Sequence, residues 1–247
     1  MKSHTILSPP DTTRFQAVLF DLFGTLVQDF VFSLGSANTD LATVLAVPRE
    51  PFAQLWRRTS EMRIDGTFQS VEASILHVCN AIGERVRAER VARAVEIRLD
   101  QIRQALKPKP DAVPMLKQLK EEGYKIGLLS NCSIEIPLLW PETPFAEFMD
   151  ATVFSSRESL KKPDPHIYDV ACARLGAAPP DCVYVADGEN FELAAAASAG
   201  LHPVLIRNTA ADSRGERLRE AREWRGASIY ALAEVSDFLK NRASGPD

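Results

Sequence analysis

The chain has 247 residues, of which 45% are hydrophobic and 25% charged, enough for one large domain or for a core domain with a smaller inserted one. The formal net charge is −4 and basic residues are interleaved with acidic ones, so neither nucleic acid nor a membrane surface is an expected partner. The apolar runs fall far short of the roughly 20 residues of a membrane helix, and the four cysteines lack the Cys-x-x-Cys spacing of zinc or redox sites.

The first strand is predicted close to the N-terminus. Residues 1–13 are interpreted as a loose leader without the apolar segment of a secretory signal, so a cytoplasmic location is expected. The apolar run that follows predicts a strand over 16–21 that is buried on both faces. This strand delivers Asp21 at its carboxyl end, and Gly24 permits a tight turn directly after it.

A helical segment separates this first strand from the rest of the sheet. From about residue 29 to residue 106, apolar residues recur at helical spacing and no strand pattern is evident. The sequence therefore predicts a small all-α domain over 30–107, inserted into a core domain formed by 14–29 and 108–247. The apolar positions of the four predicted helices are Leu41, Val44 and Leu45; Phe52, Leu55 and Trp56; Val71, Ile75, Val78 and Ile82; and Val91, Val95, Ile102 and Leu106.

After the insert, short apolar runs alternate with helical patterns. Helices are expected to end near Gly123, Gly176 and Gly200, because glycine is the usual residue just past a helix end. Strands that alternate with helices predict a parallel sheet covered on both faces, which is a Rossmann-like α/β fold. The further predicted strands are 124–129, 151–154, 182–186 and 203–206, followed by a tail of helix, short strand and helix.

Polar side chains with catalytic chemistry follow three of the predicted strands. Asp21 ends the first, Ser130 and Asn131 follow the second, and Asp187 follows the strand over 182–186, with Lys162 in a preceding loop. Because the carboxyl ends of parallel strands face one crevice, we expect these groups to meet there. A carboxylate nucleophile with a hydroxyl, an amide, a lysine and a second acid suits in-line displacement at a phosphoryl group or at an electrophilic carbon.

Four segments carry a family resemblance: Asp21-Leu22-Phe23-Gly24-Thr25-Leu26, Leu128-Leu129-Ser130-Asn131, Lys162-Pro163-Asp164-Pro165-His166-Ile167-Tyr168 and Val185-Ala186-Asp187-Gly188-Glu189-Asn190-Phe191-Glu192-Leu193. In this order they resemble the motifs of the haloacid dehalogenase superfamily of hydrolases. Each motif alone is a weak signal, whereas four in order with sensible gaps are a specific one. The resemblance covers about residues 15–207, and the helical insert resembles the cap that closes over the active site in this family.

The resemblance implies a catalytic role for four residues. Asp21 would be the nucleophile that forms a covalent aspartyl intermediate, and Thr25 and Ser130 would hydrogen-bond the transferred group. Lys162 would offset the negative charge of the nucleophile and the substrate. Each residue also has a plain structural interpretation, such as a turn cap or a solvated lysine. An ionisable group directly after a buried strand is costly unless it is used, however, and this favours function for Asp21.

The resemblance also implies a magnesium site and a substrate site. Asp21, Asp187 and the main-chain carbonyl of Phe23 would hold Mg²⁺, which prefers oxygen ligands. Glu192 occupies the position of a second family acid and is either a further ligand or a charge at a helix N-terminus. The remaining candidates, Gly24, Asn131, Arg57 and Tyr168, together with the Phe23 ring, are expected to line the substrate site.

Phe23 limits which reaction can be assigned. Most phosphatases of this family carry a second aspartate at this position, which protonates the leaving group. Such acid–base help is worth about 100- to 10,000-fold, and a phenyl ring supplies none of it. Either the leaving group departs unprotonated, as a halide, an acyl phosphate or a phosphoanhydride does, or the cap provides the proton donor.

Two chemistries compete for this sequence. An aromatic residue at position 23, Tyr168 after Lys162, and Arg57 within a cap-like Leu55-Trp56-Arg57 segment resemble 2-haloacid dehalogenases. Those enzymes need no metal and have a small polar residue in place of Asp187. The sequence therefore favours magnesium-dependent hydrolysis of a phosphoryl group on a small metabolite, by a monomer or homodimer. The alternatives are a 2-haloacid dehalogenase and a catalytically weak protein that binds a phosphorylated ligand.

Overall fold

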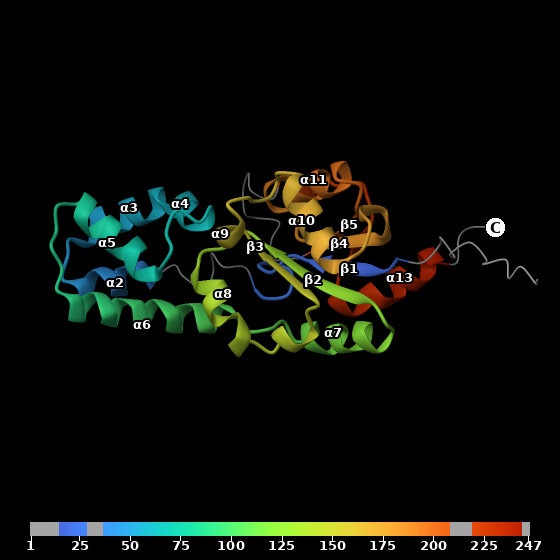
Figure 1. The fold of residues 1–247 in the computed structure, drawn as a ribbon, viewed down its shortest axis with the longest axis horizontal. Coiled ribbons are helices and arrows are strands. Elements are labelled where there is room, and N and C mark those ends of the chain that lie inside the picture. The colour runs from blue at the N-terminus through green and yellow to red at the C-terminus, as the bar shows by residue number, and fades with distance from the viewer. Residues whose placement is uncertain (1–14, 29–36, 208–218, 244–247) are drawn as a thin grey trace, which may run out of the picture.

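The computed structural model describes residues 15–28, 37–207 and 219–243 (Figure 1). Its strands form one parallel sheet of six strands in the order β3-β2-β1-β4-β5-β6. The predicted α/β class is thus confirmed, while the predicted leader 1–13 lies outside the described residues. The strands are β1 (Ala17–Phe20), β2 (Lys125–Ser130), β3 (Ala151–Phe154), β4 (Cys182–Ala186), β5 (His202–Ile206) and β6 (Ser228–Ile229).

Helices cover both faces of the sheet. Helices α7 (Ala112–Glu121) and α13 (Val235–Ala243) pack on one face, and α10 (His166–Leu175) and α11 (Glu192–Ser198) pack on the other. The core also contains three shorter helices, α8 (Glu135–Leu139), α9 (Ser155–Glu158) and α12 (Arg219–Glu223). Successive side chains of a strand point to opposite faces. Accordingly, Val18 and Phe20 of β1 pack on the side of α7 and α13, whereas Ala17 and Leu19 pack on the other side. All four are fully buried, which explains the uninterrupted apolar run.

The regular secondary structure of the described residues between positions 30 and 107 is entirely helical. These helices pack around a hydrophobic cluster of their own that includes Phe52, Trp56 and Ile75. This helical insert lies beyond the end of the sheet, at the left of Figure 1. Its exact boundaries at 30 and 107 stay a prediction. The helices of the insert are α2 (Ala37–Leu45), α3 (Arg49–Arg58), α4 (Ser60–Ile64), α5 (Val71–Ala81) and α6 (Ala88–Ala105).

Helix α6 connects the insert to the core. Its first half contributes Val91 and Ala94 to the insert cluster, and its second half places Ile102 in the core beside the sheet. A buried ion pair joins Arg98 of α6 to Glu135 of α8, with 2.8 Å between Nε and Oε1. The insert is therefore attached by packing and by charge as well as by the chain. None of the helices within the described ranges is both long and apolar enough to cross a membrane.

Candidate active site

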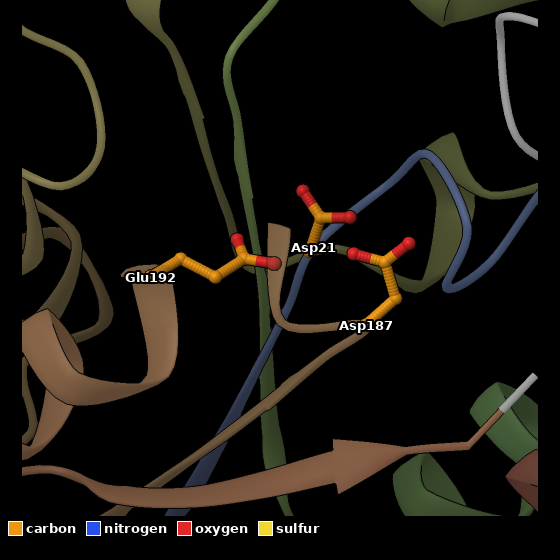
Figure 2. Close-up of side chains that lie close together, drawn as sticks. All are labelled: Asp21, Asp187 and Glu192. Atoms are coloured by element: carbon orange, nitrogen blue, oxygen red, sulfur yellow. The ribbon is translucent and has the colours of Figure 1, made fainter. Parts of the chain in front are cut away.

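Three acidic residues meet at the carboxyl edge of the sheet. Asp21 directly follows β1, and its backbone N–H donates to the carbonyl oxygen of Val185 in β4 at 3.0 Å. Asp187 directly follows β4, and Glu192 is the first residue of α11. One carboxylate oxygen from each of the three acids lies within 4.8 Å of the others (Figure 2). The parallel topology thus brings together acids that are far apart in the sequence.

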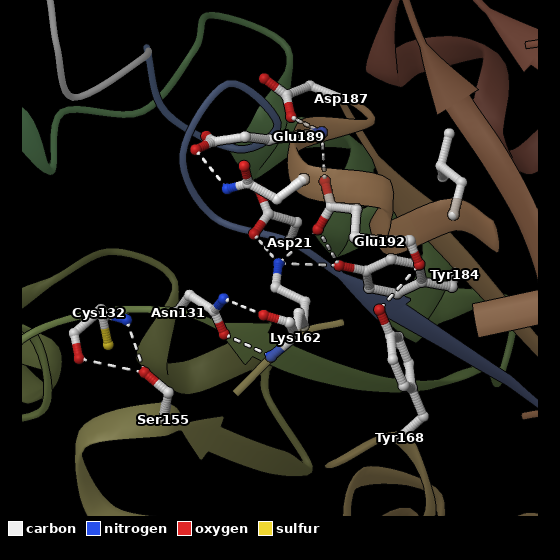
Figure 3. Close-up of polar contacts among 12 residues, drawn as sticks. Asp21, Asn131, Cys132, Ser155, Lys162, Tyr168, Tyr184, Asp187, Glu189 and Glu192 are labelled. Atoms are coloured by element: carbon white, nitrogen blue, oxygen red, sulfur yellow. Dashed lines mark hydrogen bonds and ion pairs between the residues drawn. The ribbon is translucent and has the colours of Figure 1, made fainter. Parts of the chain in front are cut away.

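Lys162 binds two of these acids. Its Nζ donates to Asp21 Oδ1 at 2.5 Å, to Glu192 Oε2 at 2.6 Å and to the Tyr184 hydroxyl at 2.9 Å (Figure 3). These contacts match the three N–H bonds of an ammonium group. Burial by itself lowers the pKa of Lys162, but the negative charges of Asp21 and Glu192 outweigh it and hold the pKa above its ordinary value. The buried ammonium therefore stays charged and fixes both carboxylates.

Asn131 holds the backbone of Lys162. Its Nδ2 donates to the Lys162 carbonyl oxygen, and the Lys162 N–H donates to Asn131 Oδ1, both at 2.8 Å. This reciprocal pair connects the end of β2 to the loop that carries the lysine (Figure 3). Asn131 lies on the wall of the cavity described below, and its amide is engaged in positioning Lys162.

The three acids carry more negative charge than the lysine neutralises. Burial raises the pKa of Asp21 to about 7, although Lys162 opposes the shift. Burial also raises the pKa of Asp187 well above its ordinary value, and the negative charges of Glu192 and Asp21 add to the effect. Like charges held this close disfavour one another's ionised forms. The site therefore favours a further positive charge.

Asp187 has a carboxylate oxygen that is available to bind a cation. Its Oδ2 is buried and has no hydrogen-bond partner among the described residues. Gly24 lies directly against it, with φ +80°, and a Cβ at this position would stand 2.0 Å from Asp187 Oδ2. Glycine is thus required both for the turn and for the close approach. Because the donor set consists of oxygens, these residues fit a hard divalent cation such as Mg²⁺.

Glu192 has fewer atoms to offer. Besides Lys162, its Oε2 accepts from the Tyr184 hydroxyl at 2.6 Å, and its Oε1 accepts from the Glu189 N–H at 3.2 Å. It therefore orients Lys162 in this structure, whereas Asp187 has an oxygen left over. Thr25 and Ser130 are also fully buried at this edge of the sheet, and their hydroxyl oxygens lack partners in the described part of the chain.

A cavity of about 650 Å³ lies between this edge and the helical insert. Phe23 is half-buried on its wall beside Asp21, and no carboxylate occupies that position. Gly24, Thr25, Ser130 and Asp187 are buried and are not part of the wall. The wall includes Asp21, Phe23, Asn131, Lys161, Lys162 and Glu192 from the core and Glu61, Arg63 and Arg98 from the insert.

Three residues expected to line the substrate site are not part of the cavity wall: the buried Gly24, and Arg57 and Tyr168, which lie elsewhere. Arg57 is exposed on α3 and does not line the cavity, because Phe52 and Trp56 direct the opposite face of α3 into the insert cluster. Tyr168 is buried in α10, and its hydroxyl donates to the main-chain oxygen of Glu192 at 2.8 Å. This hydrogen bond holds the first residue of α11, and Tyr168 itself is not part of the cavity wall.

Sequence reasoning missed several groups of the site. Tyr184 belongs to a buried strand, and its only signal was a polar hydroxyl within an otherwise apolar run. Lys109 follows the insert, and its Nζ donates to the Gly24 carbonyl oxygen at 2.5 Å. Burial lowers the pKa of Lys109. Arg63 replaces Arg57 at the cavity. Phe191 is half exposed on the wall with φ +61°, an uncommon conformation that tends to occur at functional sites.

A parallel sheet with acids at its central strand ends and a helical insert after the first strand defines an α/β protein with an acid-lined cavity at the sheet edge. Within this class, the chain belongs to the haloacid dehalogenase-like hydrolase family, whose model matches residues 15–200. The chain is accordingly a hydrolase of this family, and the family resemblance of the four motifs is confirmed.

Relatives of both reaction types are found. The chain is 28% identical over 196 residues to the (S)-2-haloacid dehalogenase 4A of Burkholderia cepacia, covering 77% of this chain and 82% of that protein. It is 35% identical over 103 residues to the glyceraldehyde 3-phosphate phosphatase of Methanopyrus kandleri, a match that spans only 41% of this chain and 44% of that protein. The fold is similar to that of the 2-haloacid dehalogenase from Pseudomonas syringae, with a TM-score of 0.69, 20% identity and coverage of 92% of this chain and 99% of that one.

Proposed function

We propose that this hydrolase is a magnesium-dependent enzyme that removes a phosphoryl group from a small metabolite, with Asp21 as the nucleophile. The observation that carries the proposal is the buried carboxylate of Asp187, whose Oδ2 has no partner among the described residues and which stands next to Asp21. A dehalogenase that works without a metal has no use for this additional buried charge. A phosphatase needs it to hold a cation.

Each of these residues has its own role in the proposed reaction. Asp21 attacks phosphorus, so that a bond forms between its carboxylate oxygen and phosphorus while the bond from phosphorus to the leaving oxygen breaks with its electron pair. Water then attacks phosphorus and releases Asp21 and phosphate. Lys162 neutralises the nucleophile, and the Thr25 and Ser130 hydroxyls donate to the transferred group. Asp21, Asp187 and the Phe23 carbonyl would hold Mg²⁺, which would supply charge neutralisation for the phosphoryl oxygens.

Phe23 restricts the leaving group. It lines the cavity beside Asp21 and has no proton to donate. Because general acid catalysis is worth about 100- to 10,000-fold, an alkoxide is a poor leaving group here. The substrate class supported best is therefore an acyl phosphate or a phosphoanhydride, whose leaving group departs without a proton.

The test is a substrate panel of acyl phosphates, alkyl phosphate esters and 2-haloacids, each assayed with Mg²⁺ and with a chelator. We expect phosphate release from acyl phosphates only with Mg²⁺. Phe23→Asp should raise the turnover of alkyl esters, since it restores an acid at the missing position. Halide release in the presence of the chelator, without phosphate release, would contradict the proposal.

A second candidate is a 2-haloacid dehalogenase. The aromatic Phe23 and the similarity to a dehalogenase along most of the chain favour it. In this reaction Asp21 would attack carbon and the halide would leave with its electron pair, so no proton donor is needed.

Lack of turnover for every class, with phosphonate binding that depends on Mg²⁺, would instead indicate a catalytically weak protein that binds phosphorylated ligands.

We also infer that the enzyme is a monomer or homodimer in the cytoplasm. The acidic balance of the chain, which offers no basic surface for a membrane, supports the location, and the oligomeric state is kept as a prediction from the sequence. Light scattering of the purified protein and fractionation of the cells that make it are the direct measurements.

A further inference from the structure

Arg63 is a buried cation on the insert side of the cavity. It lies in α4 and is only 8% exposed, yet it lines the cavity wall. Its Nη1 donates to Thr59 Oγ1 and its Nη2 to the Trp56 carbonyl oxygen, both at 2.9 Å. The guanidinium also lies over the Trp56 ring, 4.1 Å from the centroid. These contacts fix the orientation of the guanidinium, but all of them are to neutral groups.

The other cations of the cavity wall are paired. They are Arg98 with Glu135, Lys161 with Glu61, and Lys162 with Asp21. Among the described residues, no carboxylate oxygen lies close enough to Arg63 to form an ion pair, for which the limit is 4.0 Å. A buried charge without a counter-ion is expensive and needs an opposite charge nearby.

The surroundings of Arg63 add to its need for an anion. Burial, and then the positive charge of Arg98, lower the pKa of Arg63 to about 10, so the guanidinium remains protonated at neutral pH. Glu135 is the acid nearby, and it is already bound to Arg98 at 2.8 Å. Because Glu61 is paired with Lys161 and Glu135 with Arg98, the guanidinium of Arg63 leaves this end of the cavity with a net positive charge. The opposite end holds the acids around Asp21.

We propose that Arg63 binds a second anionic group of the substrate, so that the substrate is a small phosphorylated compound that also carries a carboxylate or another phosphate. Arginine suits this role because its planar donors match the oxygens of either group, and its two known hydrogen bonds leave further N–H groups available. The inference rests on the proposed phosphoryl chemistry for the first anionic group. Arg63 is here a specificity residue, whereas a purely structural role would confine it to capping the end of α3.

The experiment uses phosphonates, which have no hydrolysable bond to phosphorus. Alkylphosphonates are compared with phosphonocarboxylates and bisphosphonates of the same chain lengths, by titration calorimetry with Mg²⁺. We expect wild-type protein to bind a probe with two anionic groups about 10- to 100-fold more tightly than its matched alkylphosphonate, as a charged hydrogen bond to arginine implies. The chain length that binds best measures the span, and the tighter of the two classes tells carboxylate from phosphate.

Arg63→Gln should abolish this preference while leaving alkylphosphonate binding within about threefold of wild type. Arg58→Gln, an exposed arginine of the neighbouring helix, is the matched control and should keep the full preference. Arg63→Lys retains the charge without the planar donors and should show a reduced preference. It also decides the question if Arg63→Gln does not fold.

The two failures are distinguishable. A wild-type protein that binds both probe classes equally, or an Arg63→Gln protein that keeps the preference, overturns the subsite even if phosphate esters are hydrolysed. Absence of any phosphate release, with a preference that still depends on Arg63, overturns the proposed reaction and leaves the anion subsite in place. A loss of melting temperature in Arg63→Gln with unchanged binding ratios would assign the residue to helix capping alone.

Discussion

The two ends of the cavity are charged in opposite ways and are built from different parts of the fold. At the sheet edge, Asp21 and Asp187 follow central strands, and Lys162 is fixed between Asp21 and Glu192. At the insert end, Arg63 projects from a helix of five residues, and its position depends on packing against Trp56. We infer that the rigid sheet carries the chemistry and the helical insert carries the recognition.

The largest effect is expected at the sheet edge. Asp21→Asn removes the proposed nucleophile and should lower turnover by about 10,000-fold or more, as losses of a nucleophile do in other enzymes. The same variant should still fold, because an amide can occupy the space of the carboxylate. Single-turnover phosphate release and a melting curve measure both properties. A variant that retains the wild-type rate would refute the assignment.

The next effect concerns the joint between the two regions. Glu135→Gln removes the carboxylate that binds Arg98, and both side chains are almost fully buried, so stability should fall by about 3–5 kcal/mol. Although burial opposes it, the positive charge of Arg98 lowers the pKa of Glu135 below its ordinary value of 4.5. A carboxyl group whose pKa is lower in the folded state stabilises the protein fully at pH values above its ordinary pKa of 4.5. This contribution disappears as the pH falls through the folded-state pKa. Urea unfolding from about pH 7 to about pH 3 should therefore show the gap to wild type narrowing in acid.

A smaller effect of opposite sign is expected for Asp187→Asn. The variant removes one of three neighbouring buried negative charges, so without metal it should be more stable than wild type, by about 1 kcal/mol. Because the pKa of Asp187 is raised on folding, its ionisation opposes folding, and the advantage of the variant should grow as the pH rises above 3.8. Mg²⁺ should raise the melting temperature of wild type only. Equal stabilisation of both proteins by Mg²⁺ would argue against the metal site.

The smallest effect is expected for a second link between insert and core. Arg103 of α6 pairs with Glu142 at 2.8 Å, but these side chains are 42% and 54% exposed. Water screens such pairs, so Glu142→Gln should leave the melting temperature unchanged at moderate salt. It is the matched control for Glu135→Gln, because both acids pair with arginines of α6 and differ mainly in their burial. Comparable losses from both variants would show that burial does not set the strength of these links.

The sheet edge could be anticipated from the sequence more fully than the insert. A residue that follows a buried strand has a defined place, because parallel strands all end at one edge, and this located Asp21, Ser130 and Asp187. A residue on a short helix has no such reference. Its direction depends on which helix face is buried, and this put Arg63 at the cavity in place of Arg57. The roles assigned to these residues stay predictions until the variants are measured.

By itself, the sequence determined the fold class, the order of the elements and the acids that end the central strands, because apolar periodicity and motif spacing are local properties of the chain. Only the tertiary structure decided which polar groups engage one another. It placed the Tyr184 hydroxyl between Lys162 and Glu192, left Asp187 Oδ2 without a partner among the described residues, and turned Arg63 towards the cavity. These contacts join segments distant in the chain, and their energies depend on burial and on mutual distance, which no local pattern records.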